Sequence, residues 1–288
     1  MPESYAVSSP AFFFFSVLIQ VCQPAIHHFC IVTNKSITML TKINNTIKYG
    51  KQHGGFGIQI LYPGLVRPQL NDTGFFTLGR IDHARITPGT LIPMHPHQDD
   101  EILTYLRSGT VKHLDSEGFT DIISNQKLMM MNAGAKFLHE ERVLEEGGVL
   151  EGLQIFIRPA TAGLQAQVQF YELQETYSLN QWRKIAGKGD DYPLQIRSDT
   201  WLMDLRLETQ QQIVLPGIAE KNTAFLFYVF SGKVQVNEAL LLGTGESVLI
   251  EKENPVFNAL EESDIVLFIT QTNTDYFAEC MYSGNLQS

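Results

Sequence analysis

The chain has 288 residues, of which 44% are hydrophobic and 18% are charged. This length allows one large domain or two domains of ordinary size, with a sizeable core. The formal net charge of −10 argues against a protein that binds a nucleic-acid backbone directly, because such proteins carry a basic surface. Three scattered cysteines cannot build a disulfide framework, so we expect a reducing, cytoplasmic location.

The first 38 residues differ in character from the rest of the chain. Residues 11–32 are strongly apolar, but no Lys or Arg precedes them as in an export signal. The uninterrupted apolar run ends before Gln20, short of the roughly 20 residues that a membrane span needs. We therefore expect no membrane association and interpret residues 1–38 as a non-native or disordered extension before Met39. A degenerate export signal is the alternative.

From about residue 54 onward, short apolar runs alternate with Gly, Pro, Asn and Asp. Many short strands at regular spacing are typical of a β-sandwich or β-barrel. Residues 103–118 and 226–240 share an apolar strand, a Ser-Gly turn and a second strand. This weak repeat predicts two β-barrels in tandem. We place the first barrel at residues 39–165 and the second at residues 166–288.

The histidines are confined to the first half of the chain. Because imidazole is the usual protein ligand for transition metals, a metal site of this kind belongs to the first barrel. The second barrel is expected to be structural, with its acidic surplus on a solvated face. Among the histidines, we expect His83 and His113 to be structural or solvated. All eight are His27, His28, His53, His83, His95, His97, His113 and His139.

Two short histidine motifs predict a metal site. His95 and His97 are alternate residues of a predicted strand and therefore point to the same face, as does Glu101 if the strand continues without a bulge. Further along the chain, His139 and Glu141 again share a face. Three imidazoles and one carboxylate suit Fe(II), Mn(II), Ni(II), Cu(II) or Zn(II). The pattern alone leaves open whether Glu101 or Glu141 is the fourth ligand.

These motifs resemble those of a known family. Residues 89–109 resemble the first cupin motif, in which a glycine, a His-x-His pair and a glutamate precede a second glycine. More narrowly, HPHQDDEILTYL (95–106), LMMMNAGAKFLHEE (128–141) and LQIFIRP (153–159) resemble the pirin family, a branch of the cupins. The resemblance extends over roughly residues 54–288 and is most specific in the first barrel.

The resemblance implies an all-β fold of two tandem cupin (jelly-roll) β-barrels. It also implies a single iron ion in the first barrel, held by three histidines and one glutamate, which fall on His95, His97, His139 and Glu141. Glu101 is then a pocket residue, and we interpret it as a catalytic base.

One departure from the family is at Gln98-Asp99-Asp100, where pirin-like proteins often have Arg-Gly-Phe. This replacement removes a cation from the expected mouth of the metal site and adds two acids. An anionic substrate group is therefore disfavoured there.

The family resemblance also implies a reaction, because some pirin-like proteins open the flavonol quercetin with O2. We therefore expect a quercetin 2,3-dioxygenase-type oxygenase that acts on a small aromatic substrate with O2 and one mononuclear ion. Fe(II) is favoured, with Mn, Ni, Cu or Zn as other candidates. Two alternatives remain: a non-catalytic, iron-dependent redox-sensing module that binds a protein partner, and a small-molecule-binding or isomerising cupin with Zn or Mn.

Overall fold

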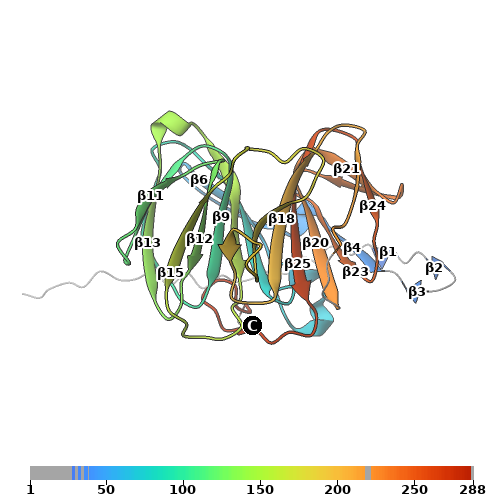
Figure 1. Cartoon of the computed structure of the whole chain (residues 1–288), viewed down its shortest axis with the longest axis horizontal. Helices are drawn as coiled ribbons and strands as arrows, with labels where there is room; N and C mark the ends of the chain where they lie inside the picture. The colour runs from blue at the N-terminus through green and yellow to red at the C-terminus, as the bar shows by residue number, and fades with distance from the viewer. Residues whose placement is uncertain (1–27, 30–31, 34–35, 38, 218–221, 287–288) are drawn as a thin grey trace, which may run out of the picture.

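The computed structural model describes residues 28–29, 32–33, 36–37, 39–217 and 222–286. Figure 1 shows two β-barrels side by side, with the N-terminal half of the chain mainly in one and the C-terminal half mainly in the other. The prediction of an all-β fold with two barrels is confirmed. The extension expected at residues 1–38 lies outside the described residues, apart from β1 (His28–Phe29), β2 (Val32–Thr33) and β3 (Ser36–Ile37).

The first barrel consists of a seven-stranded and a four-stranded antiparallel sheet. The larger sheet has the order β15 (Gln167–Glu172), β12 (Lys127–Asn132), β9 (Glu101–Ser108), β14 (Leu150–Ile157), β7 (Leu78–Ile86), β6 (Phe56–Leu61) and β5 (Tyr49–His53). The smaller sheet has the order β11 (Thr120–Ile123), β10 (Val111–Asp115), β13 (Phe137–Val143) and β8 (Leu91–His97).

The second barrel repeats this arrangement with an eight-stranded and a four-stranded sheet. The larger sheet has the order β1, β4 (Met39–Ile43), β23 (Ser247–Glu251), β20 (Thr223–Ser231), β25 (Ser263–Gln271), β18 (Thr200–Leu207), β16 (Arg183–Gly187) and β17 (Leu194–Gln195). The smaller sheet has the order β19 (Gln212–Val214), β24 (Val256–Ala259), β21 (Lys233–Val236) and β22 (Leu240–Gly243). Short 3₁₀ helices lie in the connections: η1 (Asn45–Ile47), η2 (Pro63–Val66), η3 (Pro68–Leu70) and η4 (Glu145–Gly147).

The larger sheets of the two barrels pack face to face. One continuous apolar cluster contains Leu103 and Leu153 of the first barrel together with Leu226 of the second. Strand β9 is therefore covered on both sides, and its residues from Glu101 to Arg107 are all buried. Because side chains alternate along a strand, β9 divides its residues between the barrel interior and this interface.

Strands exchanged between the two halves of the chain complete both larger sheets. Strand β4 precedes the first barrel in sequence but pairs with β23 of the second, while β15 follows the first barrel and pairs with its β12. In Figure 1, the blue strand β4 accordingly lies in the barrel formed by the C-terminal half. The predicted boundary at residues 165 and 166 therefore does not coincide with the division between the sheets.

The predicted repeat corresponds to equivalent positions in the two barrels. Strands β9 and β20 lie inside the larger sheets, and β10 and β21, which follow them, lie in the smaller sheets. The glycine between the strands has a positive φ in each case, +77° at Gly109 and +92° at Gly232. A residue with a side chain rarely adopts this conformation, which explains why Ser-Gly recurs at both turns.

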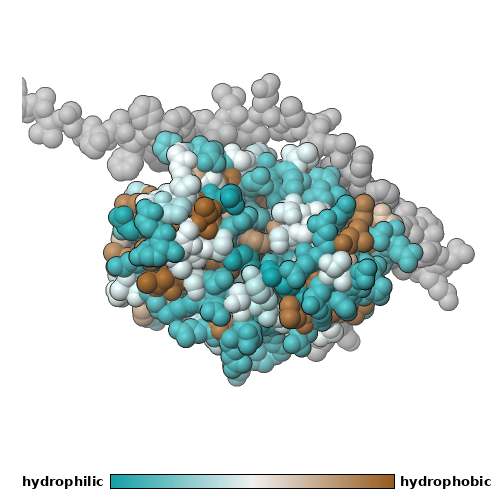
Figure 2. All heavy atoms as spheres, turned by 90° about the horizontal axis from the view of Figure 1, so that it is seen from above, coloured by the Kyte–Doolittle hydropathy of each residue, from teal (hydrophilic) through white to brown (hydrophobic). Residues whose placement is uncertain are grey.

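Figure 2 shows a largely hydrophilic surface in which hydrophobic residues are scattered among polar ones. Among the residues that the structure describes, no helix is both long enough and apolar enough to cross a bilayer.

The contact between the barrels includes a half-buried histidine. His83 Nδ1 lies 2.8 Å from the hydroxyl of Tyr228, and the His83 ring stacks on Phe230 with centroids 4.6 Å apart. The Lys48 ammonium group donates a hydrogen bond to the same hydroxyl at 2.9 Å. Burial, together with the nearby Lys48 charge, lowers the pKa of His83 to about 4. The folded protein therefore holds this imidazole in its neutral form at neutral pH.

We predict that His83 makes the free energy of unfolding depend on pH. An unfolded histidine has a pKa of about 6.5. Between about pH 6.5 and 4, His83 is therefore protonated in the unfolded chain but not in the folded protein. The contribution of His83 to the free energy of unfolding is fully present above pH 6.5. It decreases as the pH falls towards 4, by at most about 3 kcal/mol. Urea unfolding of the His83→Gln variant should show a flatter pH profile over this range than the unmodified protein. The exposed His53→Gln change is the control, and equal slopes for His83→Gln and the unmodified protein would contradict the prediction.

Candidate metal centre

The smaller sheet of the first barrel brings the two histidine motifs together. Strand β8 pairs with β13 so that His95 lies directly opposite His139 and His97 lies opposite Phe137. The register then shifts by one residue, and Glu141 pairs with Ile92. This irregularity is a β-bulge in β8, a feature that often redirects side chains near functional sites. The strand pairing therefore places the three predicted imidazole ligands side by side.

The three imidazoles converge through their Nε2 atoms. His139 Nε2 lies 2.9 Å from His95 Nε2 and 2.9 Å from His97 Nε2. His139 and His97 are buried, and His95 is half-buried. Burial, reinforced by the neighbouring histidines, holds the pKa of His139 far below its usual range, and burial also lowers the pKa of His95. The imidazoles of His139 and His95 are therefore neutral at neutral pH.

The donor chemistry of this cluster fits a divalent transition-metal ion. A neutral imidazole has one N–H for two ring nitrogens. His95 Nδ1 is 2.8 Å from the carbonyl oxygen of Pro93, which places the proton on Nδ1 and leaves a lone pair on Nε2. His97 Nδ1 is buried and has no hydrogen-bond partner in the part of the chain that the structure describes. Nitrogen lone pairs that converge away from water repel one another, and a bound cation would turn this repulsion into attraction.

Glu141, the predicted fourth ligand, lies beside His139. Ligand atoms of Glu141, His139 and His113 all lie within 4.8 Å of one another, whereas the group formed by the three predicted imidazoles does not contain Glu141. Glu141 is 6% exposed, and burial raises the pKa of its carboxyl group to about 7. The structure therefore brings three of the four predicted ligands to one point and leaves the fourth next to one of them.

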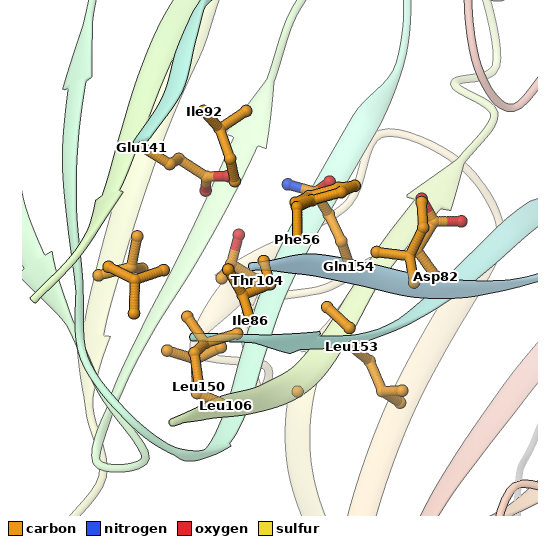
Figure 3. Close-up of a pocket in the computed structure, with 15 residues that line it drawn as sticks. Phe56, Asp82, Ile86, Ile92, Thr104, Leu106, Glu141, Leu150, Leu153 and Gln154 are labelled. Carbon is orange, nitrogen blue, oxygen red and sulfur yellow. The ribbon is translucent and has the colours of Figure 1, made fainter. Parts of the chain in front are cut away.

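A small cavity inside the first barrel adjoins Glu141. Its volume is about 60 Å³, and its walls are mainly aliphatic and aromatic side chains. Figure 3 shows Glu141 at one end, Thr104 in the middle, and Gln154 and Asp82 at the far side. The Thr104 hydroxyl is buried, and no described residue forms a hydrogen bond with it. The barrel interior thus offers an apolar space with a few polar groups next to the histidine cluster.

The C-terminal segment of the chain packs against the site from outside the barrel. The Tyr282 ring lies 4.9 Å from the His97 ring, between ring centroids. The fully buried Asp100 carboxylate accepts hydrogen bonds from the backbone N–H groups of Tyr282 and Ser283 and from the Ser283 hydroxyl. Asp99 accepts one from the backbone of Gly163. The two acids expected at the mouth of the site are therefore buried and anchor neighbouring segments instead.

Glu101 does not join the histidine cluster. Strand β8 ends at His97 and β9 begins at Glu101, so the continuous strand on which its predicted orientation depended does not exist. Its carboxylate accepts hydrogen bonds from the Arg197 side chain at 2.6 Å, the Arg197 backbone at 2.7 Å and the Asn132 amide at 3.0 Å. It faces the second half of the chain, and its position gives no support to the predicted role as a base.

One residue near the cluster was not predicted to belong to the site. His113 is fully buried, and its Nδ1 lies 3.4 Å from His139 Nδ1. The sequence signal is the alternation of His113 and Asp115 on a predicted strand, which places both on one face.

Comparisons with known proteins agree with this fold. Residues 66–157 match the family model described as Pirin, and residues 185–269 match the model of the quercetinase C-terminal cupin domain. The chain is 29% identical over 201 residues to the quercetin 2,3-dioxygenase of Escherichia coli, covering 69% of this chain and 84% of the relative. It is 28% identical over 185 residues to a pirin-like protein of Caulobacter vibrioides, covering 60% of this chain and 63% of that protein.

A solved structure has the same fold. The bacterial pirin of Escherichia coli in complex with nickel(II) superposes with a TM-score of 0.69 at 22% identity, covering 81% of this chain and 99% of that one. The two matching family models, the two-barrel fold and the histidine cluster in the first barrel agree with one another. The chain belongs to the pirin family.

Proposed function

We propose that this protein is a metal-dependent oxygenase of the quercetin 2,3-dioxygenase type, acting on a flavonol-like or catechol-like aromatic with O2. The observation that carries the proposal is the convergence of three imidazole Nε2 atoms, 2.9 Å from one to the next, inside the first barrel. Relatives at 27–29% identity that are named for this activity support the reaction class. Because one fold hosts many activities, the site rather than the barrel is the basis of the argument.

In this proposal, His95, His97 and His139 hold the ion and Glu141 completes the ligand set. Fe(II) is the favoured ion, and Mn(II), Ni(II), Cu(II) and Zn(II) also suit these donors. When bound, the ion supplies Lewis-acid attraction for an ionised hydroxyl group and a path for electrons between that group and O2. The chain itself supplies the orientation of the ligands and an environment from which water is excluded.

The exposure of the ligands indicates where an aromatic substrate would approach. His95 is half-buried on β8, which is an edge strand, and its neighbour Met94 is 45% exposed. His97 and His139 are covered by the rest of the barrel. Pockets that enclose drug-sized ligands have volumes of roughly 300–1,000 Å³. The barrel cavity, at about 60 Å³, is too small to enclose such a ligand. We therefore infer that the aromatic substrate approaches across His95.

Glu141, and not Glu101, has the position that the fourth ligand needs in this proposal. Glu141 borders both His139 and the cavity, and burial without a cation raises its pKa to about 7. A divalent cation beside His139 would lower that pKa and favour the ionised carboxylate, which is the form that binds metal. Glu101, by contrast, is held by Arg197 on the other side of its strand.

We predict that the His97→Ala variant does not hold a metal ion. The substitution removes the His97 imidazole, which is one of the three converging nitrogen donors, and leaves a buried gap beside the other two. Metal content after dialysis, with Fe(II), Ni(II) and Zn(II) each supplied separately, should fall from one ion per chain to near zero. His53→Ala, in an exposed position, is the control. Retention of one ion per chain by a folded His97→Ala protein would contradict the proposed ligand set.

We also predict that O2 uptake with quercetin requires the loaded site. Protein reconstituted with each candidate ion should consume O2 in an oxygen-electrode assay with quercetin, and a simple catechol should be tested alongside it. Metal-free protein and the His97→Ala variant should show no uptake above the rate without protein. If the metal-free protein consumed O2 with quercetin as fast as the loaded protein, the proposed function would be wrong.

A further inference from the structure

A second histidine, followed by an aspartate, lies directly behind the metal-facing imidazole of His139. Strand β10 pairs with β13 so that Asp115 is opposite His139 and His113 is opposite Glu141. His113 and His139 are fully buried, and Asp115 is 6% exposed. All of these side chains therefore lie on the inner face of the smaller sheet, away from solvent.

The side chains form a continuous series of hydrogen bonds that leads to the cluster. Asp115 Oδ2 lies 2.7 Å from His113 Nε2, and His113 Nδ1 lies 3.4 Å from His139 Nδ1. On its other oxygen, Asp115 Oδ1 accepts hydrogen bonds from the backbone N–H groups of Glu117 and Phe119. The backbone turn therefore fixes the orientation of the carboxylate that begins the series.

This pattern determines where the protons lie on both rings. The carboxylate accepts, so the proton of neutral His113 is on Nε2 and its Nδ1 carries a lone pair. That lone pair accepts the N–H of His139 Nδ1. His139 must then present the lone pair of its Nε2 to His95 and His97, which is the form that binds a metal ion.

We propose that His113 and Asp115 are positioning residues, which hold His139 in the tautomer and orientation that bind metal. The inference rests on the metal site of the proposed function and assigns its orienting partners. Outer partners of this kind commonly orient metal-binding histidines, and their loss typically weakens metal binding by about 10–100-fold. The other two ligands differ: a backbone carbonyl orients His95, and His97 Nδ1 lies 3.9 Å from Asp100 Oδ2, beyond hydrogen-bond distance, with no hydrogen-bond partner among the described residues.

The positions of these side chains fit a series of hydrogen bonds better than they fit a second metal site. His113, His139 and Glu141 place ligand atoms within 4.8 Å of one another, as a metal site would. An ion there in addition to the first would need both nitrogens of His139 as ligands and therefore a fully deprotonated ring. A hydrogen bond between the two Nδ1 atoms needs only one proton on the His139 ring and leaves its Nε2 free for the first ion. The geometry therefore favours one ion per chain with His113 behind it.

The test is the Asp115→Asn variant, which keeps the shape of the side chain and reverses one hydrogen bond. The amide oxygen would stay with the backbone N–H groups of the turn, so the NH2 group would face His113 Nε2. His113 would then carry its proton on Nδ1, facing His139, and His139 would move its own proton to Nε2. The same reasoning explains why replacing the aspartate of a Ser-His-Asp triad with asparagine selects the wrong histidine tautomer.

The measurement is the dissociation constant of full-length protein for Ni(II) and for Zn(II), by competition with a chelator of known affinity. We expect Asp115→Asn and His113→Phe to weaken binding by about 10–100-fold while the stoichiometry stays at one ion per chain. Asp191→Asn, the same change at an exposed position in the second half of the chain, is the control and should bind as the unmodified protein does. Circular dichroism confirms that each variant is folded.

Unchanged affinity in folded Asp115→Asn protein would overturn the positioning role. Two ions in the unmodified protein and one in His113→Phe would also overturn it, because His113 would then be a ligand. The test reads metal affinity alone, so a failure of the loaded protein to consume O2 would count against the oxygenase and not against this inference.

Discussion

The site depends on holding three imidazoles with their Nε2 atoms directed at one point away from water. This arrangement is unfavourable by itself, because converging lone pairs repel and each buried nitrogen has lost its contact with water. The pairing of β8 with β13, which sets His95 opposite His139, imposes it. A shift of one residue in that pairing would turn one histidine motif away from the other. The strand register and the core that enforces it are therefore the first requirement of the metal centre.

The second half of the chain contributes to this rigidity although it has no histidine of its own. Its larger sheet covers the outer face of β9 and β14, and Arg197 holds Glu101 at the point where β9 begins. Its C-terminal segment binds Asp100 and places Tyr282 against the ring of His97. Strands β4 and β15 each complete the sheet of the other half. The second barrel therefore helps to hold the loop between His97 and Glu101 in place.

The sequence predicts the parts of this arrangement that depend on local periodicity. Alternation along a strand correctly puts His95 and His97 on one face, and the Ser-Gly turns mark equivalent positions in the two barrels. Prediction from the sequence fails where a contact between residues far apart in the chain determines the position of a side chain or strand. The orientation of Glu101 depends on a break in the strand that buried hydrogen bonds stabilise, and the exchange of β4 and β15 depends on pairing between strands far apart in sequence. The contact of His113 with His139 likewise follows from the register between β10 and β13, which no single segment encodes.

In the first barrel, the side chains that orient the metal ligands lie on one side, and the cavity that a reactant can enter lies on the other. On the side of β10, His139 is backed by His113 and Asp115, whose hydrogen bonds leave little freedom for the ring. On the other side, Glu141 adjoins a cavity in which the Thr104 hydroxyl has no hydrogen-bond partner among the described residues. A buried polar group without a partner costs free energy, and such costs are tolerated most readily where a site has a function. The side of the barrel formed by β10 and β13 thus sets the geometry of the ligands, while the cavity beside Glu141 leaves the Thr104 hydroxyl available to a small molecule that enters it.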